Sequence, residues 1–137
     1  MMRKLDQRGV ASFEFVVVAA AFFTLVFAIF DLGRYAITMQ SLRSLAGAGA
    51  RAAMINDCYT DAVLKGMTPS CSGDYLPDDK KKALAPFLYA GGLSPTLSTA
   101  TGASALTTTA SQPGFTMLFP IWGTALNAPS ASTNVPF

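Results

Sequence analysis

Residues 10–33, VASFEFVVVAAAFFTLVFAIFDLG, decide the fold of this chain. From Phe15 to Phe30 only Thr24 interrupts the apolar side chains. A helix over that stretch rises about 24 Å, and the flanking residues extend it toward the roughly 30 Å hydrocarbon core of a bilayer. The sequence therefore predicts a transmembrane helix over residues 10–33.

The helical pattern continues past the predicted membrane span, and no proline occurs before Pro69. Apolar or small residues recur at steps of three and four, which places them on one face of a helix. They are Leu32, Tyr35, Met39, Leu42, Ala46, Gly49 and Ala53. We expect an amphipathic continuation over residues 34–56, and hence one helix about 70 Å long from Val10 to about Ile55.

Residues 1–9, MMRKLDQRG, form a short polar segment before the apolar run. Its three basic side chains outnumber the single carboxylate of Asp6. Positive charge on one side of a span keeps that side in the cytoplasm. We therefore expect a cytoplasmic leader at residues 1–9, with everything beyond the span translocated.

Residues 57–137 are expected to form a small exported domain. Prolines and glycines predict loop over most of residues 57–82, including a solvated turn at Lys80–Lys82. A short helix is expected around Asp78 to Leu88, because Pro77 is suited to its start and Pro86 limits its length.

The last third of the chain predicts a small antiparallel sheet. Threonine-rich Leu97–Ala110 is compatible with strands, and Gln112–Gly114 is a turn signal. Gly114–Trp122 alternates apolar side chains and predicts a strand that Pro120 confines to an edge. Asn127–Phe137 is expected to be a loop or tail. The predicted fold class is α+β, with the long N-terminal helix packed on this sheet.

Cys58 and Cys71 are the only cysteines. An even number in an exported chain indicates one disulfide, which would stabilise the fold by about 3 kcal/mol. Two free thiols in a reducing compartment are the alternative.

Composition excludes several classes of function. The net charge of +2 is too small and too dispersed for a nucleic-acid partner. The chain has no histidine, which removes most metal sites and most acid–base catalysis. No phosphate-binding glycine motif occurs, since Gly47 and Gly49 lie inside a helical pattern rather than after a strand. We expect no enzyme activity, no cofactor, no metal and no small-molecule substrate.

Glu14 lies inside the margin of the apolar helix, five residues after Gly9. A carboxylate there is costly, by about 2.5–3.5 kcal/mol at the bilayer centre and by less near the edge. Cleavage after Gly9 would create an α-amine at Val10 with a reference pKa near 8, which Glu14 of a neighbouring subunit could neutralise. The alternative is a glutamate at the headgroup level that needs no partner.

This combination resembles the signal of type IV prepilins and pseudopilins, which a prepilin peptidase cleaves at the cytoplasmic side. A closer resemblance covers about a third of the chain. Arg8–Gly9, Glu14–Phe15, Asp31–Arg34 and Gly49–Arg51 are similar to the N-terminal pattern of the TadE-like family, minor pilins of tight-adherence (Tad/Flp) pilus systems. Many members carry a proline midway through the apolar run, where this chain has Val18–Ala21.

The resemblance implies a structural or assembly subunit of a pilus-like adhesion or secretion apparatus. Its implied partners are the prepilin peptidase, a major pilin and other minor pilins, the inner-membrane assembly platform and the lipid bilayer. Its implied location is the inner membrane, with one span, a cytoplasmic N-terminus and a periplasmic or extracellular domain.

Two questions stay open at the level of sequence. Asp31 and Arg34 lie three residues apart at the outer end of the span, and either contact another subunit or mark the membrane boundary. The chain as a whole is alternatively a single-pass anchored periplasmic binding module. An ordinary signal peptide is disfavoured, because the apolar stretch exceeds the usual 7–15 residues.

Overall fold

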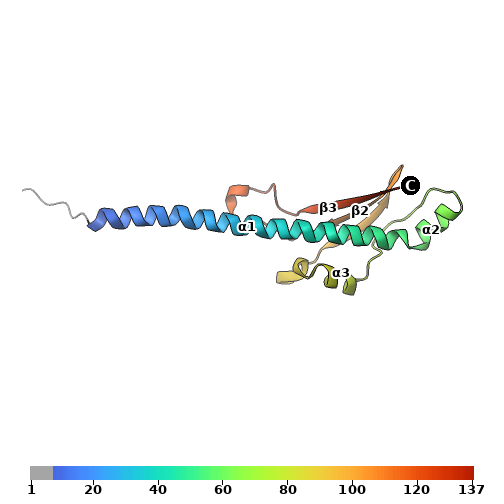
Figure 1. Cartoon of the computed structure of the whole chain (residues 1–137), viewed down its shortest axis with the longest axis horizontal. Coiled ribbons are helices and arrows are strands. Elements are labelled where there is room, and N and C mark those ends of the chain that lie inside the picture. Colours follow the sequence, from blue (N-terminus) through green and yellow to red (C-terminus); the bar gives the residue numbers. More distant parts are fainter. Residues whose placement is uncertain (1–7) are drawn as a thin grey trace, which may run out of the picture.

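The computed structural model describes residues 8–137 and consists of one long helix with a small sheet against its C-terminal half (Figure 1). Its elements are α1 (Arg8–Met54), α2 (Asp57–Leu64), α3 (Asp78–Leu84), the 3₁₀ helix η1 (Pro86–Gly92), β1 (Thr96–Thr101), β2 (Ala105–Ser111), the 3₁₀ helix η2 (Pro120–Trp122) and β3 (Ser130–Pro136). The predicted α+β class and long N-terminal helix are confirmed. The expected leader at residues 1–9 lies outside the described residues, except for its last two.

α1 is continuous because nothing in its sequence breaks it: it contains no proline, and its 47 residues keep a helical pattern throughout. Its N-terminal half projects from the rest of the molecule as the blue part of Figure 1. The large apolar side chains from Val10 to Phe30 that lie there are exposed, apart from the half-buried Val26. This helix is long and apolar enough to cross a membrane once.

Of the predicted amphipathic stripe, Leu42, Ala46, Gly49 and Ala53 are buried, Tyr35 and Met39 are half-buried, and Leu32 is exposed. The C-terminal half of α1 buries this face against the sheet and the short helices. Its fully buried apolar residues are Leu42, Leu45, Ala46, Ala50 and Ala53. Leu88 from η1 and Leu97 and Ala110 from the sheet complete the main cluster. The core therefore lies between α1 and the sheet, beyond the apolar half of the helix.

The sheet has three antiparallel strands in the order β1-β2-β3. Side chains alternate between the face on α1 and the outer face, as in any half-buried sheet. Thr99 and Thr108 lie opposite each other on the inner face, and their hydroxyls hydrogen-bond at 3.1 Å. This bond satisfies two polar groups that would otherwise be costly to bury.

Two predictions about the C-terminal third are wrong. Residues 114–122 form no strand: they are a loop that contains η2. Residues 130–136, expected to be a loop or tail, form β3 and pair with all of β2. The prediction failed because Phe115 and Phe119 pack on aromatic side chains of α1 instead of on a sheet.

The polar stretch before α3 also differs from expectation. Residues 57–64 form α2 rather than loop, capped by Asn56, whose side chain accepts a hydrogen bond from the Cys58 N–H at 3.1 Å. The short helix expected from Asp78 is confirmed as α3, which ends at Leu84, before Pro86.

Lys81 on α3 is buried rather than part of a solvated turn. Its Nζ donates to an Asp74 carboxylate oxygen and, at 2.8 Å, to Asp78 Oδ1. Burial alone would lower the pKa of this ammonium, but the hydrogen bonds and charges of both aspartates outweigh it, so the pKa of Lys81 is raised. The hydrogen bond from Lys81 in turn lowers the pKa of Asp78. Lys81 therefore stays charged and holds α3 to the segment before it.

Gly49 marks the close approach of α1 to the sheet. A Cβ at Gly49 would lie 2.8 Å from Leu97 Cδ2 and 3.0 Å from Thr108 Cγ2, whereas a Cβ at Gly47 would meet nothing within 4 Å. Both glycines are helical, so alanine at either position should gain the same helix propensity, about 1 kcal/mol. At Gly49 the added methyl group also overpacks the core, which typically costs about 1–3 kcal/mol.

We expect Gly47→Ala to raise the free energy of unfolding by roughly 1 kcal/mol and Gly49→Ala to leave it unchanged or lower it. Chemical denaturation of the full chain in detergent, followed by near-ultraviolet circular dichroism, measures both. Equal stabilisation by the two variants would show that α1 and the sheet can separate slightly at no cost.

Candidate functional site

The predicted processing and assembly residues lie in the first turns of α1. The Gly9–Val10 peptide bond is in the first turn, and both residues are exposed. Glu14 is exposed as well, and its carboxylate makes no hydrogen bond or ion pair with any residue in the described range 8–137. This part of the chain offers an accessible glycine and a carboxylate that has no partner among residues 8–137.

The second group of predicted residues, Asp31 and Arg34, lies at the point where α1 leaves its apolar half. Arg34 Nη1 donates to Asp31 Oδ1 at 3.0 Å, so the predicted i,i+3 pair is formed. Asp31 is only 2% exposed, which is unusual for a carboxylate next to an apolar helical stretch. A buried charge of this kind requires further partners.

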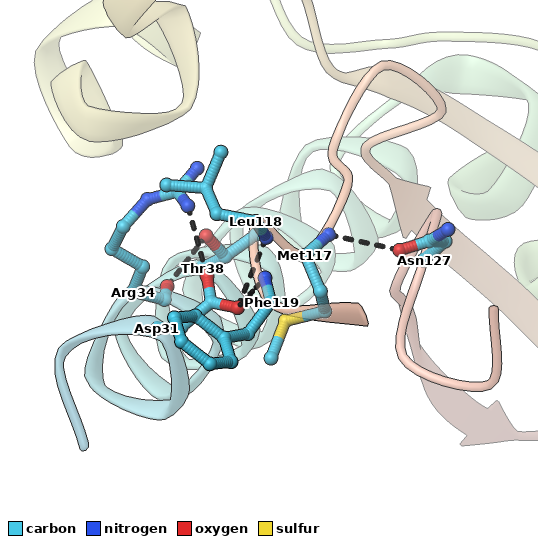
Figure 2. A network of polar contacts seen from close by, with 7 residues as sticks. All are labelled: Asp31, Arg34, Thr38, Met117, Leu118, Phe119 and Asn127. Atoms are coloured by element: carbon cyan, nitrogen blue, oxygen red, sulfur yellow. Dashed lines mark hydrogen bonds and ion pairs between the residues drawn. The ribbon is translucent and has the colours of Figure 1, made fainter. Parts of the chain in front are cut away.

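Those partners come from the far end of the sequence. The backbone N–H groups of Leu118 and Phe119 both donate to Asp31 Oδ2 at 3.0 Å. Figure 2 shows the carboxylate between the Arg34 guanidinium on one side and these two amides on the other. One side chain of α1 therefore binds a segment almost ninety residues away in the sequence, and both of its oxygens accept hydrogen bonds.

Residues 115–128, here called the return loop, connect β2 to β3 by way of this contact. The loop is closed at its base, where the Ala128 N–H donates to the Phe115 carbonyl at 2.9 Å. Met117 N–H donates to Asn127 Oδ1 at 2.9 Å across the loop. These bonds give the loop a fixed shape of its own, and Asp31 fixes its position on α1.

Aromatic contacts also hold the return loop in this position on α1. The Phe115 ring lies 6.3 Å from the Tyr35 ring and 5.3 Å from the Arg34 guanidinium carbon. The Phe119 ring stacks on Phe27 at 6.4 Å, one helical turn closer to the N-terminus than Asp31. Thr38 completes the network by donating to the Arg34 carbonyl at 2.9 Å.

The sequence predicted the Asp31–Arg34 pair but not the return loop. Neither interpretation of the pair, as a subunit contact or as a boundary marker, included a contact within the chain. A usable signal was present, since a carboxylate that ends an apolar run needs backbone or side-chain donors. Nothing local identified the donors as Leu118 and Phe119.

The predicted disulfide between Cys58 and Cys71 is present, with a sequence separation of 13. It joins α2 to the segment that leads into α3. Cys71 is buried, and its N–H and carbonyl both hydrogen-bond Thr101 Oγ1, at 2.8 and 2.9 Å. Within the described residues 8–137, no cluster of three or more histidine, cysteine, aspartate or glutamate side chains could hold a metal ion.

Comparison with known proteins agrees with this assignment of the N-terminal helix. Residues 9–51 match the family model described as TadE-like protein. The match begins at Gly9, includes Glu14, Asp31 and Arg34, and covers just under a third of the chain. No curated protein and no solved structure is significantly similar to the chain. The resemblance stated from the sequence is therefore confirmed over α1.

Proposed function

Because residues 9–51 of this chain are TadE-like, we propose that it is a minor pilin-like structural subunit of a Tad/Flp-type pilus or secretion apparatus. The observation that carries the proposal is the family match together with the apolar half of α1, whose large side chains are mostly exposed. The proposed role is assembly rather than catalysis, and a chain without histidine suits it.

The division of α1 supports this role physically. The sheet, α3 and η1 pack on the C-terminal half, and in the apolar half the large side chains are mostly exposed, with the return loop reaching it only at Phe27. In a bilayer that half contacts lipid, and on assembly it can pack against the equivalent helices of other subunits. The domain would then lie outside the cytoplasm, where an oxidising compartment maintains the disulfide.

Glu14 has a defined part in this proposal. Its carboxylate lies among exposed apolar side chains with no partner among the described residues. Prepilin cleavage after Gly9 would give a neighbouring subunit a charged amine at Val10. Pairing of that amine with Glu14 would remove the cost of holding each charge alone in lipid, and would set the axial position of one helix on the next.

Processing is tested by expressing the full chain in membranes with and without a cognate prepilin peptidase and measuring its mass. We expect a new N-terminus at Val10 that depends on the peptidase. Gly9→Leu should abolish it, whereas Gly33→Leu, at an open helical position on the same element, should not. An intact Met1 in the presence of the peptidase contradicts the proposal and leaves the single-pass binding module.

Glu14→Gln separates assembly from processing in the same assay. We expect this variant to be cleaved normally, because the scissile bond is unchanged, but to lose co-purification with the other pilins of its system. Normal co-purification of Glu14→Gln would remove the role given to the Glu14 carboxylate.

A further inference from the structure

The return loop brings an apolar segment of the folded domain back to the apolar half of α1. Its contact with Phe27 lies one helical turn, about 6 Å, toward the N-terminus from Asp31. In Figure 1 the segment is the orange turn that lies beside α1 where the exposed half of the helix ends. Residues 118–122, here called the loop tip, are the part of the domain that reaches furthest along this half.

The loop tip exposes large apolar side chains and carries no charge. Leu118 is 72% exposed and Ile121 is 58% exposed, with Phe119, Pro120 and Trp122 beside them. No charged residue occurs anywhere after Lys82. Exposed apolar side chains of this size, grouped on one short segment, indicate a contact surface rather than a solvated loop.

Most backbone N–H groups of the tip donate to partners within the chain. Leu118 and Phe119 donate their N–H groups to Asp31, and Pro120 has no N–H to donate. The Trp122 and Gly123 N–H groups donate to the Phe119 and Pro120 carbonyls at 3.5 and 3.2 Å. Backbone that enters lipid must satisfy its donors internally, and most backbone donors of the tip are satisfied. The indole Nε1 of Trp122 is the exception among its side chains, since it is buried with no hydrogen-bond partner among the described residues.

The hydrogen bonding of Asp31 is also compatible with a place at the edge of the hydrocarbon core. A bare carboxylate at the edge of the hydrocarbon would be costly, but both oxygens of Asp31 are bonded and the loop covers it. When residues 10–30 fill a core of about 30 Å, Phe27 lies inside its outer edge. The loop tip, stacked on Phe27, then lies at the boundary between acyl chains and headgroups.

We propose that the loop tip inserts into the outer leaflet of the bilayer that α1 spans, as a second membrane contact of the same subunit. Its surface is continuous with the exposed apolar side chains of α1, through the stacking of Phe119 on Phe27. Trp122 lies half-buried beside this surface, and its indole Nε1 is buried with no hydrogen-bond partner among the described residues. The proposal requires that α1 spans a bilayer, and it does not require processing or pilus assembly.

Trp122 is the only tryptophan in the chain, so its fluorescence reports the loop tip directly. The full chain is reconstituted in phosphatidylcholine vesicles that carry bromine at defined acyl depths, and flotation confirms that it is inserted. We expect strong quenching by bromine near the headgroup end of the acyl chain, weaker quenching by bromine near the methyl end, and protection from acrylamide in the water.

A matched control places the tryptophan at the other end of the domain. Trp122→Phe combined with Phe137→Trp moves it beside Ser104, to which the Phe137 N–H donates at 3.2 Å. This variant should be quenched by acrylamide and not by brominated lipid. If flotation shows insertion but Trp122 behaves like this control, the proposal is wrong.

The alternative is that another protein subunit, rather than lipid, covers the loop tip. The same vesicles distinguish the two cases. Protection of Trp122 from both quenchers, lost as the lipid-to-protein ratio is raised, would show that another subunit covers the tip, and would overturn the proposal. Quenching by lipid that is independent of this ratio supports it. No peptidase is present, so neither outcome depends on the proposed pilus function.

Discussion

Asp31→Ala is expected to release the return loop from α1 while the sheet stays folded. The substitution removes the acceptor of two backbone N–H groups and the partner of Arg34. Hydrogen bonds to a charged group contribute about 1.5–3 kcal/mol each, so the free energy of opening the loop should fall by about 3 kcal/mol. The core does not include Asp31, and the loss should therefore stay local.

Amide hydrogen exchange of the full chain in detergent micelles measures this effect. The protection of the Leu118 and Phe119 amides should fall about 100-fold in Asp31→Ala, since each 1.4 kcal/mol is tenfold. Amides of β2 should keep theirs. Asp61→Ala is the matched control, because Asp61 is an exposed helical aspartate whose ion pair with Lys65, at 3.9 Å, should matter by less than about 1 kcal/mol. Unchanged protection in Asp31→Ala would show that aromatic packing alone holds the loop.

Replacing both Cys58 and Cys71 with serine is expected to lower the free energy of unfolding by about 3 kcal/mol on the chain-entropy model. The loss should be visible first in α2. This helix has eight residues and buries none of them, and isolated helices of that length are marginal in water. Cys71 should stay in place, because Thr101 holds its backbone on both sides.

Chemical denaturation gives the overall loss, and hydrogen exchange in α2 locates it. Asn56→Ala is the control that weakens α2 without touching the disulfide: losing this cap should cost about 1 kcal/mol. Should the double serine variant unfold at the same denaturant concentration as the parent, the disulfide would have no stabilising role in the domain.

α1 could be predicted from the sequence because its signals are local and long. The apolar run, the stripe that follows it and the absence of proline all indicate helix, and no tertiary contact opposes them. The hairpin of β1 and β2 was partly predictable in the same way, from threonines suited to strands. These elements were predictable from the sequence because their local signals agree with one another.

The return loop could not be predicted because its partner lies on a distant helix. Residues 114–122 have the period-two pattern of a strand, but Phe115 and Phe119 pack on α1 instead of facing one side of a sheet. Asp31 accepts the N–H groups of Leu118 and Phe119, which a sheet would have used in its ladder. The free edge of β2 is then taken by residues 130–136, whose own pattern is weak.

Of the candidate site, the sequence predicted Gly9, Glu14 and the Asp31–Arg34 pair, because charge and glycine near an apolar run are visible without a structure. The ion pair is confirmed, and the roles of Gly9 and Glu14 stay predictions. It missed the Leu118 and Phe119 amides. A backbone N–H leaves no mark in the sequence, since every residue except proline has one.

Because α1 is unbroken, its apolar half and its C-terminal half move as one rigid helix. Its C-terminal half, about 35 Å long, continues the apolar half without a hinge, so in a bilayer any tilt of the apolar half would be transmitted in full to the domain. A tilt of about 20°, common for single helices, swings the far end of the C-terminal half by roughly 12 Å. Rotation of the span about its own axis turns the sheet by the same angle. A force applied through the return loop at Asp31 would act close to the point about which α1 tilts. The C-terminal end of α1 lies farthest from that point.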